Sequence, residues 1–379
     1  MEPLLVTSES DSYGDLIDIA MDLIAKSTAL RASLPASIVD SLSALVRTMN
    51  CYYSNLIEGH STHPIDIERA MMQDYSRDKE KRDLQLEARA HVEVQQWLDD
   101  GALEGRITSP ESIKEVHKQF CSRLPAELLI LDGEPVVPGQ FRTRFVQVGK
   151  HVAISPGAVE RFLDRYSAVY ERSSKSEAIV SIPAAHHRLL WIHPFMDGNG
   201  RVARLVSHAQ ILSLLETGGI WSVARGLARS EQEYKSHLMA CDATRYNDWD
   251  GRGNLSLRAL IAFTRYFLLV CVDQVEFMGK LIEPNKLRER VLNWTGQQIE
   301  EGLLPHSSIA LVQAVLYKGE LARSEAPALL GVTDRQARRV TSALVERGVL
   351  TSQSDKSPFK LAFPATLASE WMPGLFPSL

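Results

Sequence analysis

One segment constrains this chain more than any other part of its sequence: residues 191–204, which read WIHPFMDGNGRVAR. The residue before a proline avoids the right-handed helical region, so the helix that leads into the segment is predicted to end near Ile192. The glycines and the asparagine of residues 197–200 tolerate positive φ and leave little bulk over the backbone, which predicts a tight turn. An apolar periodic pattern begins at Arg201 and predicts a second helix.

The helix start after this turn is predicted to bind an anion. Its N–H groups lack partners within the helix, and the glycines let an anion approach them. Arg201 and Arg204 are three residues apart and therefore share a helical face, and their planar guanidinium groups match phosphate oxygens. His193 can accept a proton near neutral pH, and Asp197 can hold a Mg²⁺ that bridges phosphates. Together these groups indicate phosphate-ester chemistry.

Length and composition place this segment in an ordinary globular protein. A chain of 379 residues suggests two or three domains, and the net charge of −5 argues against a protein that mainly coats nucleic acid or an anionic membrane. Four scattered cysteines without a CxxC pair favour a reducing compartment. The N-terminus does not resemble a signal peptide, and the most apolar stretch, Tyr266–Val272, is too short to span a bilayer. We therefore expect a cytoplasmic protein that does not bind membranes.

Helical periodicity runs through most of the chain, so we expect a mainly α fold. One amphipathic helix is predicted to end near Gly59, and Ser109 followed by Pro110 is predicted to open another. Further helices are expected over residues 84–98, 156–170, 182–192 and 286–301. We expect an N-terminal helical region over residues 1–110, a catalytic core over 111–283, and a linker helix with a further domain over 284–379.

One segment breaks the helical pattern. Residues 141–148 and 151–155 are rich in β-prone side chains and flank Gly149-Lys150. A two-residue link that begins with glycine suits a type II′ turn, which predicts a small β-hairpin.

The C-terminal part has the outline of a winged helix-turn-helix. Residues 324–330, 331–333 and 334–347 are predicted to form a helix, a turn and a second helix, and two strand-like segments follow. Residues 306–364 carry eight Lys or Arg and five Asp or Glu, a balance of +3. The second helix could then contact DNA through Arg335, Arg338 and Arg339. The modest charge equally suits a module that contacts protein.

The segment that begins at His193 resembles the Fic family motif, HPFx[DE]GNGRxxR, and matches it at every fixed position. The resemblance implies a helical domain that transfers AMP from ATP to a Ser, Thr or Tyr hydroxyl of a target protein. It assigns the deprotonation of that hydroxyl to His193. It assigns Mg²⁺ binding at the α- and β-phosphates to Asp197.

The same resemblance assigns the phosphate contacts. The backbone of Gly198 and Gly200, together with Asn199, would cradle the phosphates. Arg201 would bind the β-phosphate region, and Arg204 the γ-phosphate. Attack in line with the α–β bond would release pyrophosphate, with catalysis by positioning and charge.

A second motif lies far upstream, where Ser54 and Glu58 stand four residues apart on one helical face before Gly59. On its own this is an exposed helix end with a glycine cap. It nevertheless resembles the Fic inhibitory motif [ST]xxxE[GN]. By that resemblance Glu58 pairs with Arg204, takes the place of the γ-phosphate, and prevents productive ATP binding.

Other positions are assigned by resemblance with alternatives left open. Residues 141–155 lie where Fic proteins carry a flap that positions the target, although a purely structural ribbon fits as well. Arg142 and Arg144 are candidates for orienting target or nucleotide. Tyr234, on the helix that closes the nucleotide pocket, is a candidate contact for the adenine or ribose. Asp242 stands near the place where the family often has asparagine.

Two histidines before the motif, His186 and His187, could form a zinc site together with His193 and Asp197 of the motif. Neighbouring side chains on a helix point about 100° apart, so packing roles are favoured instead. Trp221 and Trp249 are likewise expected to pack in the core.

The preferred function is an autoinhibited protein adenylyltransferase that uses ATP and Mg²⁺. The alternatives are a nucleotide-sensing transcriptional regulator or adaptor that works through the winged helix, and a Fic enzyme that removes AMP or uses another donor. The intact His193 argues against a purely binding role, because an anion sensor needs no base. The partners expected are ATP, a hydroxyl-bearing target protein and, by resemblance, a second copy of the chain.

Overall fold

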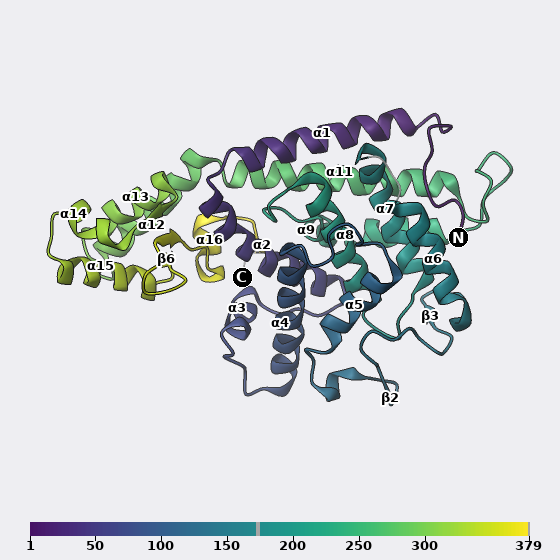
Figure 1. Cartoon of the computed structure of the whole chain (residues 1–379), viewed down its shortest axis with the longest axis horizontal. Helices are drawn as coiled ribbons and strands as arrows, with labels where there is room; N and C mark the ends of the chain where they lie inside the picture. Colours follow the sequence, from purple (N-terminus) through teal and green to yellow (C-terminus); the bar gives the residue numbers. More distant parts are fainter. Residues whose placement is uncertain (172–174, 378–379) are drawn as a thin grey trace. The chain divides into compact units, whose positions relative to one another are not determined.

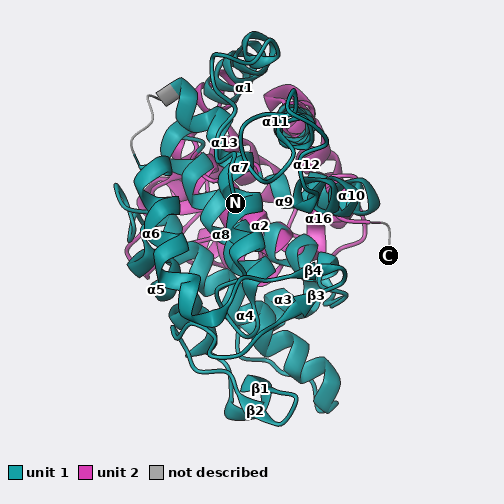
Figure 2. Cartoon of the chain, turned by 90° about the vertical axis from the view of Figure 1, so that its right-hand side faces the viewer, with its two compact units in different colours: residues 1–28, 50–217, 222–275 teal, residues 29–49, 218–221, 276–379 magenta. Residues whose placement is uncertain are grey.

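The computed structural model describes residues 1–171 and 175–377. The chain is mainly helical with short strands, which confirms the predicted fold class (Figure 1). It forms two compact units that each combine separate stretches of sequence (Figure 2). Unit 1 comprises residues 1–28, 50–217 and 222–275, and unit 2 comprises residues 29–49, 218–221 and 276–379.

Eleven helices contribute to unit 1 within the described residues. The first five are α1 Tyr13–Ala32, α2 Ala36–Ile57, α3 Pro64–Met71, α4 Lys79–Asp99 and α5 Pro110–Cys121. The next six are α6 Val159–Tyr170, α7 Lys175–Ile192, α8 Asn199–Leu215, α9 Val223–Arg229, α10 Glu231–Asp242 and α11 Leu257–Leu281. As predicted, Ser109 caps α5, because its Oγ accepts a hydrogen bond from the backbone N of Ser112 at 3.1 Å.

Two helices position the motif. α7 ends at Ile192 as predicted, and α8, which packs against it, begins at Asn199. The sequence pattern had placed that start at Arg201. The helix begins two residues earlier because Gly198, at φ 76°, turns the chain in the left-handed region and lets helical geometry start directly after it.

Two small hairpins lie between α5 and α6. The predicted one pairs β3 Gln147–Val148 with β4 His151–Val152 across Gly149, at φ 59°. Its strands are much shorter than the β-prone stretches suggested. The other pairs β1 Ile130–Leu131 with β2 Glu134–Pro135 and was not predicted. Its turn, Asp132-Gly133, has two positive φ angles, and an Asp-Gly pair is a frequent two-residue hairpin turn.

Unit 2 ends in a small helical and β structure. Its elements are α12 Pro284–Glu300, α13 Ser308–Lys318, β5 Glu320–Leu321, α14 Ala326–Leu330, α15 Asp334–Glu346, β6 Leu350–Thr351, β7 Phe359–Leu361 and α16 Ala368–Trp371. The strands form an antiparallel sheet in the order β5-β7-β6. Thr333 and Gln336 form a capping box at the start of α15. The predicted helices and the two predicted strands lie at these positions, whereas β5 was too short to be recognised.

Among the described residues no single helix is long and apolar enough to cross a membrane, although α1 and α2 together meet that test as a bent pair. Trp221 is buried, as predicted. The packing role predicted for Trp249 is wrong, because its side chain is 96% exposed. Asp250 and Asn247 satisfy backbone N–H groups of its loop, so the loop keeps its shape without burying the indole.

Candidate active site

The motif loop is fixed by its own asparagine. Asn199 is buried; its Oδ1 accepts a hydrogen bond from the backbone N of Phe195 at 2.9 Å, and its Nδ2 donates to the carbonyl of Phe195 at 2.9 Å. The side chain expected in the phosphate cradle is thus engaged with the loop. The first turn of α8 still offers unpaired backbone N–H groups, since Val202 is the first residue to bond back, to the carbonyl of Gly198.

Behind the loop, Phe195 packs face to face on His117 of α5, with ring centroids 3.9 Å apart and planes at 4°. Nδ1 of His117 accepts a hydrogen bond from the backbone N of Gly139 at 2.9 Å. Burial lowers the pKa of His117 to about 4, so its ring is neutral and acts as a packing surface. Sequence reasoning missed this residue, which lies far from the motif.

His193 and Asp197 are the motif side chains that remain accessible. His193 is half-buried in the left-handed region at φ 51°, and burial lowers its pKa to about 4. Its imidazole is therefore neutral at pH 7 and able to take a proton. Asp197 is exposed, and no group of three or more metal-binding side chains forms within the parts of the chain that the structure describes.

The predicted flap, residues 141–155, is fastened to the motif loop by Arg142. This arginine is 2% exposed. It donates to the backbone carbonyls of His193 at 2.7 Å and of Arg144 at 2.9 Å, and to those of Ile192 and Ile154. Its own backbone N bonds to the carbonyl of Pro194 at 2.9 Å. Arg142 therefore holds the flap in place, whereas Arg144 is exposed.

The two motifs predicted from sequence meet in space. Arg204 is buried; its Nε donates to Oγ of Ser54 at 2.8 Å, and its Nη2 to the carbonyl of Ser54 at 3.1 Å. The same guanidinium forms a short ion pair with Oε1 of Glu58. A Cβ added at Gly200 would collide with that carboxylate oxygen, so Glu58 lies directly against the first turn of α8. A side-chain anion thus occupies the predicted anion site.

Electrostatics favour the charged form of Glu58. Burial alone would raise the pKa of its carboxyl group, but the charge and the hydrogen bond of Arg204 outweigh this effect. The pKa of Glu58 is consequently held below its ordinary value. Removing Glu58 without supplying another anion would leave the charge of the buried Arg204 uncompensated.

Arg201 also has a partner, and sequence reasoning missed it. Its Nη1 lies 3.7 Å from Oε2 of Glu87 on α4. The same oxygen lies 2.7 Å from Nδ1 of His60, which directly follows the inhibitory motif. Glu87 stands in a helix rich in charged side chains, where nothing in the local pattern distinguishes it.

Tyr234 does not join the exposed part of the site. It is 2% exposed, and its hydroxyl lies 2.7 Å from Nε2 of His186, whose Nδ1 lies 2.8 Å from Oγ of Ser207. In this arrangement Tyr234 lies against the buried face of α8, where it also interacts with Arg204. His187 faces elsewhere and pairs with Asp242 at 3.0 Å. The two histidines thus have separate packing roles.

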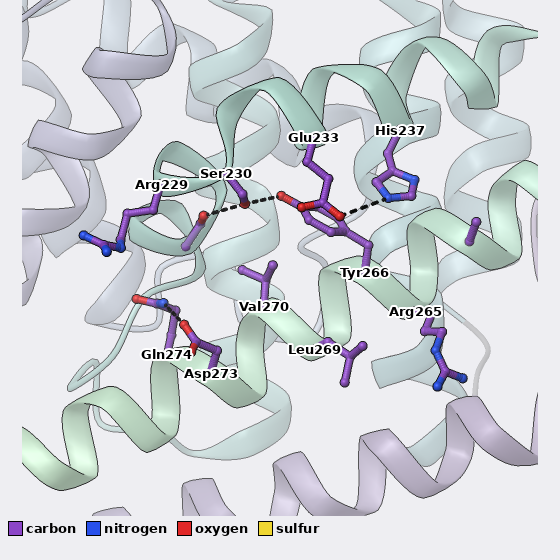
Figure 3. A pocket seen from close by; sticks show the side chains of 12 residues that line it. Arg229, Ser230, Glu233, His237, Arg265, Tyr266, Leu269, Val270, Asp273 and Gln274 are labelled. Atoms are coloured by element: carbon purple, nitrogen blue, oxygen red, sulfur yellow. Dashed lines mark hydrogen bonds and ion pairs between the residues drawn. The ribbon is translucent and has the colours of Figure 1, made fainter.

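A groove of about 600 Å³ lies between α9, α10 and α11 (Figure 3). Its polar side chains pair with one another: Ser230 with Tyr266 at 2.6 Å, and Gln274 with Asp273 at 2.7 Å. His237 stacks on Tyr266. No residue of either motif lines it, so the groove is separate from the candidate active site.

Comparisons with known proteins agree with the motif. Residues 106–211 match the Fic/DOC family model. The protein adenylyltransferase Fic of Drosophila ananassae is 36% identical over 81 residues, which are 21% of this chain and 16% of that protein, and the Drosophila melanogaster protein is 35% identical over 81 residues. The match therefore spans about a sixth of the length of these relatives.

Solved structures extend the likeness to the fold. A Fic family protein from Desulfovibrio desulfuricans G20 aligns with a TM-score of 0.57 at 15% identity, over 96% of this chain and 98% of that one. Fic-1 from C. elegans, residues 134–508, aligns with a TM-score of 0.51 at 19% identity, over 70% of this chain and 73% of that one. At these identities the agreement concerns the fold alone.

Proposed function

We propose that the protein is an autoinhibited adenylyltransferase, because residues 106–211 match the Fic/DOC family model and carry its motif. It transfers AMP from ATP to a Ser, Thr or Tyr hydroxyl of a target protein. One observation carries the proposal: a neutral, accessible His193 stands in the same loop as a helix start whose Arg204 is occupied by an internal carboxylate. A base, a phosphate site and an internal carboxylate that competes for that site suit a regulated transfer of a nucleotidyl group.

The reaction follows from these parts. The target hydroxyl gives its proton to an imidazole nitrogen of His193, and its oxygen forms a bond to the α-phosphorus of ATP. The bond from that phosphorus to the oxygen bridging to the β-phosphate breaks, and pyrophosphate leaves with the electron pair. Arg201, Arg204 and the N–H groups at the start of α8 stabilise the charge on the phosphates.

Asp197 suits a magnesium ion. Its carboxylate is exposed at the loop, in the electrostatic neighbourhood of His117 and His193. Mg²⁺ is usually held by one or two carboxylates together with substrate phosphates and water. Such an ion would neutralise phosphate charge as ATP binds, and Asp197 would hold it.

The test compares two labels. The chain is incubated with its proteome of origin and with ATP labelled at the α- or the γ-phosphate. We expect label on protein from the α position alone, because AMP retains the α-phosphate and pyrophosphate carries the γ-phosphate away. Label from γ alone would mean phosphorylation and would refute the proposal. Loss of AMP from prelabelled targets, with no labelling of fresh ones, would identify the alternative, a Fic enzyme that removes AMP.

Unit 2 supports a second function, binding of duplex DNA. Arg335, Arg338 and Arg339 are exposed on one face of α15 and form no ion pair with any described residue. In a helix-turn-helix this helix is the one that enters the major groove. In the same unit, Arg323 donates to the carbonyls of Ser354 and Ser357 and so fixes the loop between β6 and β7.

Replacing Arg335, Arg338 and Arg339 by alanine should weaken binding of a labelled duplex by about ten-fold or more, and should reduce the slope of log affinity against log salt by about three. Fluorescence anisotropy at two salt concentrations measures both. The matched control removes three exposed cations elsewhere, Arg77, Lys81 and Arg82, and should bind as wild type. If poly-glutamate binds the arginine face as tightly as DNA does, the surface serves an acidic protein instead.

A further inference from the structure

Arg201 is held by a carboxylate of its own. The side chains of Arg201 and Glu87 are only 7% and 13% exposed, so their charges face each other away from most of the solvent. The guanidinium also lies over the ring of Phe120 at 5.1 Å, and its Nε has no hydrogen-bond partner among the described residues. Glu87 therefore supplies the carboxylate nearest to this buried cation, which would be costly to leave alone.

The inhibitory segment takes part in this contact. His60 lies two residues after Glu58, and its Nδ1 is 2.7 Å from the carboxylate oxygen of Glu87 that faces Arg201. The segment from Glu58 to His60 thus reaches both arginines of the motif. Glu58 contacts Arg204 directly, and His60 reaches Arg201 through Glu87.

We propose that Glu87 is a second inhibitory carboxylate, which occupies Arg201 while Glu58 occupies Arg204. The inference rests on the proposed function, in which both arginines bind ATP phosphates. Each guanidinium faces one carboxylate. Burial lowers the pKa of the neighbouring His91 to about 3, whereas the hydrogen bond to Glu87 raises the pKa of His60, so His60 favours the charged form of Glu87. The phosphates of ATP therefore meet two arginines that each already face a carboxylate, and release of Glu58 frees only Arg204.

The test measures ATP affinity by calorimetry, in Glu58→Gly and in Glu58→Gly combined with Glu87→Gln. Glutamine keeps the volume of Glu87 and can still bond to His60, but it lacks the charge. We expect the second substitution to tighten ATP binding by about ten-fold. Glu93→Gln in the same background is the matched control, because Glu93 also lies on α4 and pairs with Arg89 and Arg123 instead; it should leave the affinity unchanged.

The effect must act through Arg201. In an Arg201→Ala background, Glu87→Gln should change ATP affinity by less than about two-fold, since a double-mutant cycle isolates the pair. An equal gain in ATP affinity in that background would show that Glu87 acts only through its charge and not through Arg201, and would overturn the proposal. Weaker ATP binding in Glu58→Gly/Glu87→Gln would also overturn the proposal, because Glu87 would then position Arg201 for ATP. Unchanged binding would overturn it as well, because Glu87 would then not compete with ATP. A variant that binds ATP more tightly yet labels no protein would refute the adenylyltransferase activity and leave the role of Glu87 intact.

Discussion

Replacing Glu58 by glycine should raise AMP transfer on the order of 10- to 100-fold. The carboxylate forms an ion pair with the buried Arg204 and lies against the first turn of α8, which are the groups that would otherwise bind the terminal phosphate of ATP. Its removal leaves Arg204 with its bonds to Ser54 and open to an anion. Initial rates of labelling from α-labelled ATP measure the change.

Glu58→Gln separates charge from shape. It keeps the size of the side chain and removes the charge, so it should raise transfer by less than Glu58→Gly does. Glu68→Gly, which removes another glutamate from the neighbouring helix α3, serves as the control and should leave the rate at the wild-type level. Equal labelling by wild type and Glu58→Gly would show that the contact with Arg204 is not inhibitory.

Replacing His193 by alanine in the Glu58→Gly background should lower AMP transfer by about 10²- to 10⁴-fold, the usual contribution of a general base. ATP affinity should stay within about two-fold, because Arg201, Arg204 and the backbone N–H groups remain. Calorimetry measures ATP binding, and incorporation of label from α-labelled ATP measures AMP transfer. His237→Ala, a histidine of the separate groove, should transfer AMP at the rate of its parent.

The pH dependence of transfer distinguishes this base from an ordinary histidine. Burial lowers the pKa of His193 to about 4, so the imidazole is protonated and inactive below that value and neutral above it. The rate should therefore rise as the pH increases through about 4 and stay level from pH 6 to 8. A rise centred near 6.5 would contradict this environment, since that is the ordinary pKa of histidine.

The local features of the site could be predicted from the sequence. The end of α7 follows from Pro194, the tight turn from the glycines, and the shared face of Arg201 and Arg204 from their spacing. The pairing of Glu58 with Arg204 came from resemblance to a known motif, since no local rule places two residues so far apart in sequence side by side. The structure brings them into contact.

The features of the site that the sequence did not predict depend on tertiary contacts or on hydrogen bonds that engage a side chain within the protein. Asn199 looked available to phosphates, but the loop backbone uses both ends of its amide. The burial of Tyr234 beside His186 and Arg204 could not be read from the sequence, and its contact with the nucleotide stays a prediction. Glu87 and His60 approach Arg201 from another helix and a loop, and neither stands in a pattern that marks it.

The hydrogen bonds of Arg142 separate the fixed base of the flap from its exposed outer side chains. A single guanidinium ties the flap to the carbonyl groups of Ile192 and His193, so a shift at the base of the flap would also displace His193, the proposed base. The outer side chains Phe145, Val148 and Val152 are between 51% and 71% exposed and take no part in those hydrogen bonds. Substitutions at these three side chains would leave the hydrogen bonds of Arg142 intact, so under the proposed function they would alter the choice of target without altering the chemistry.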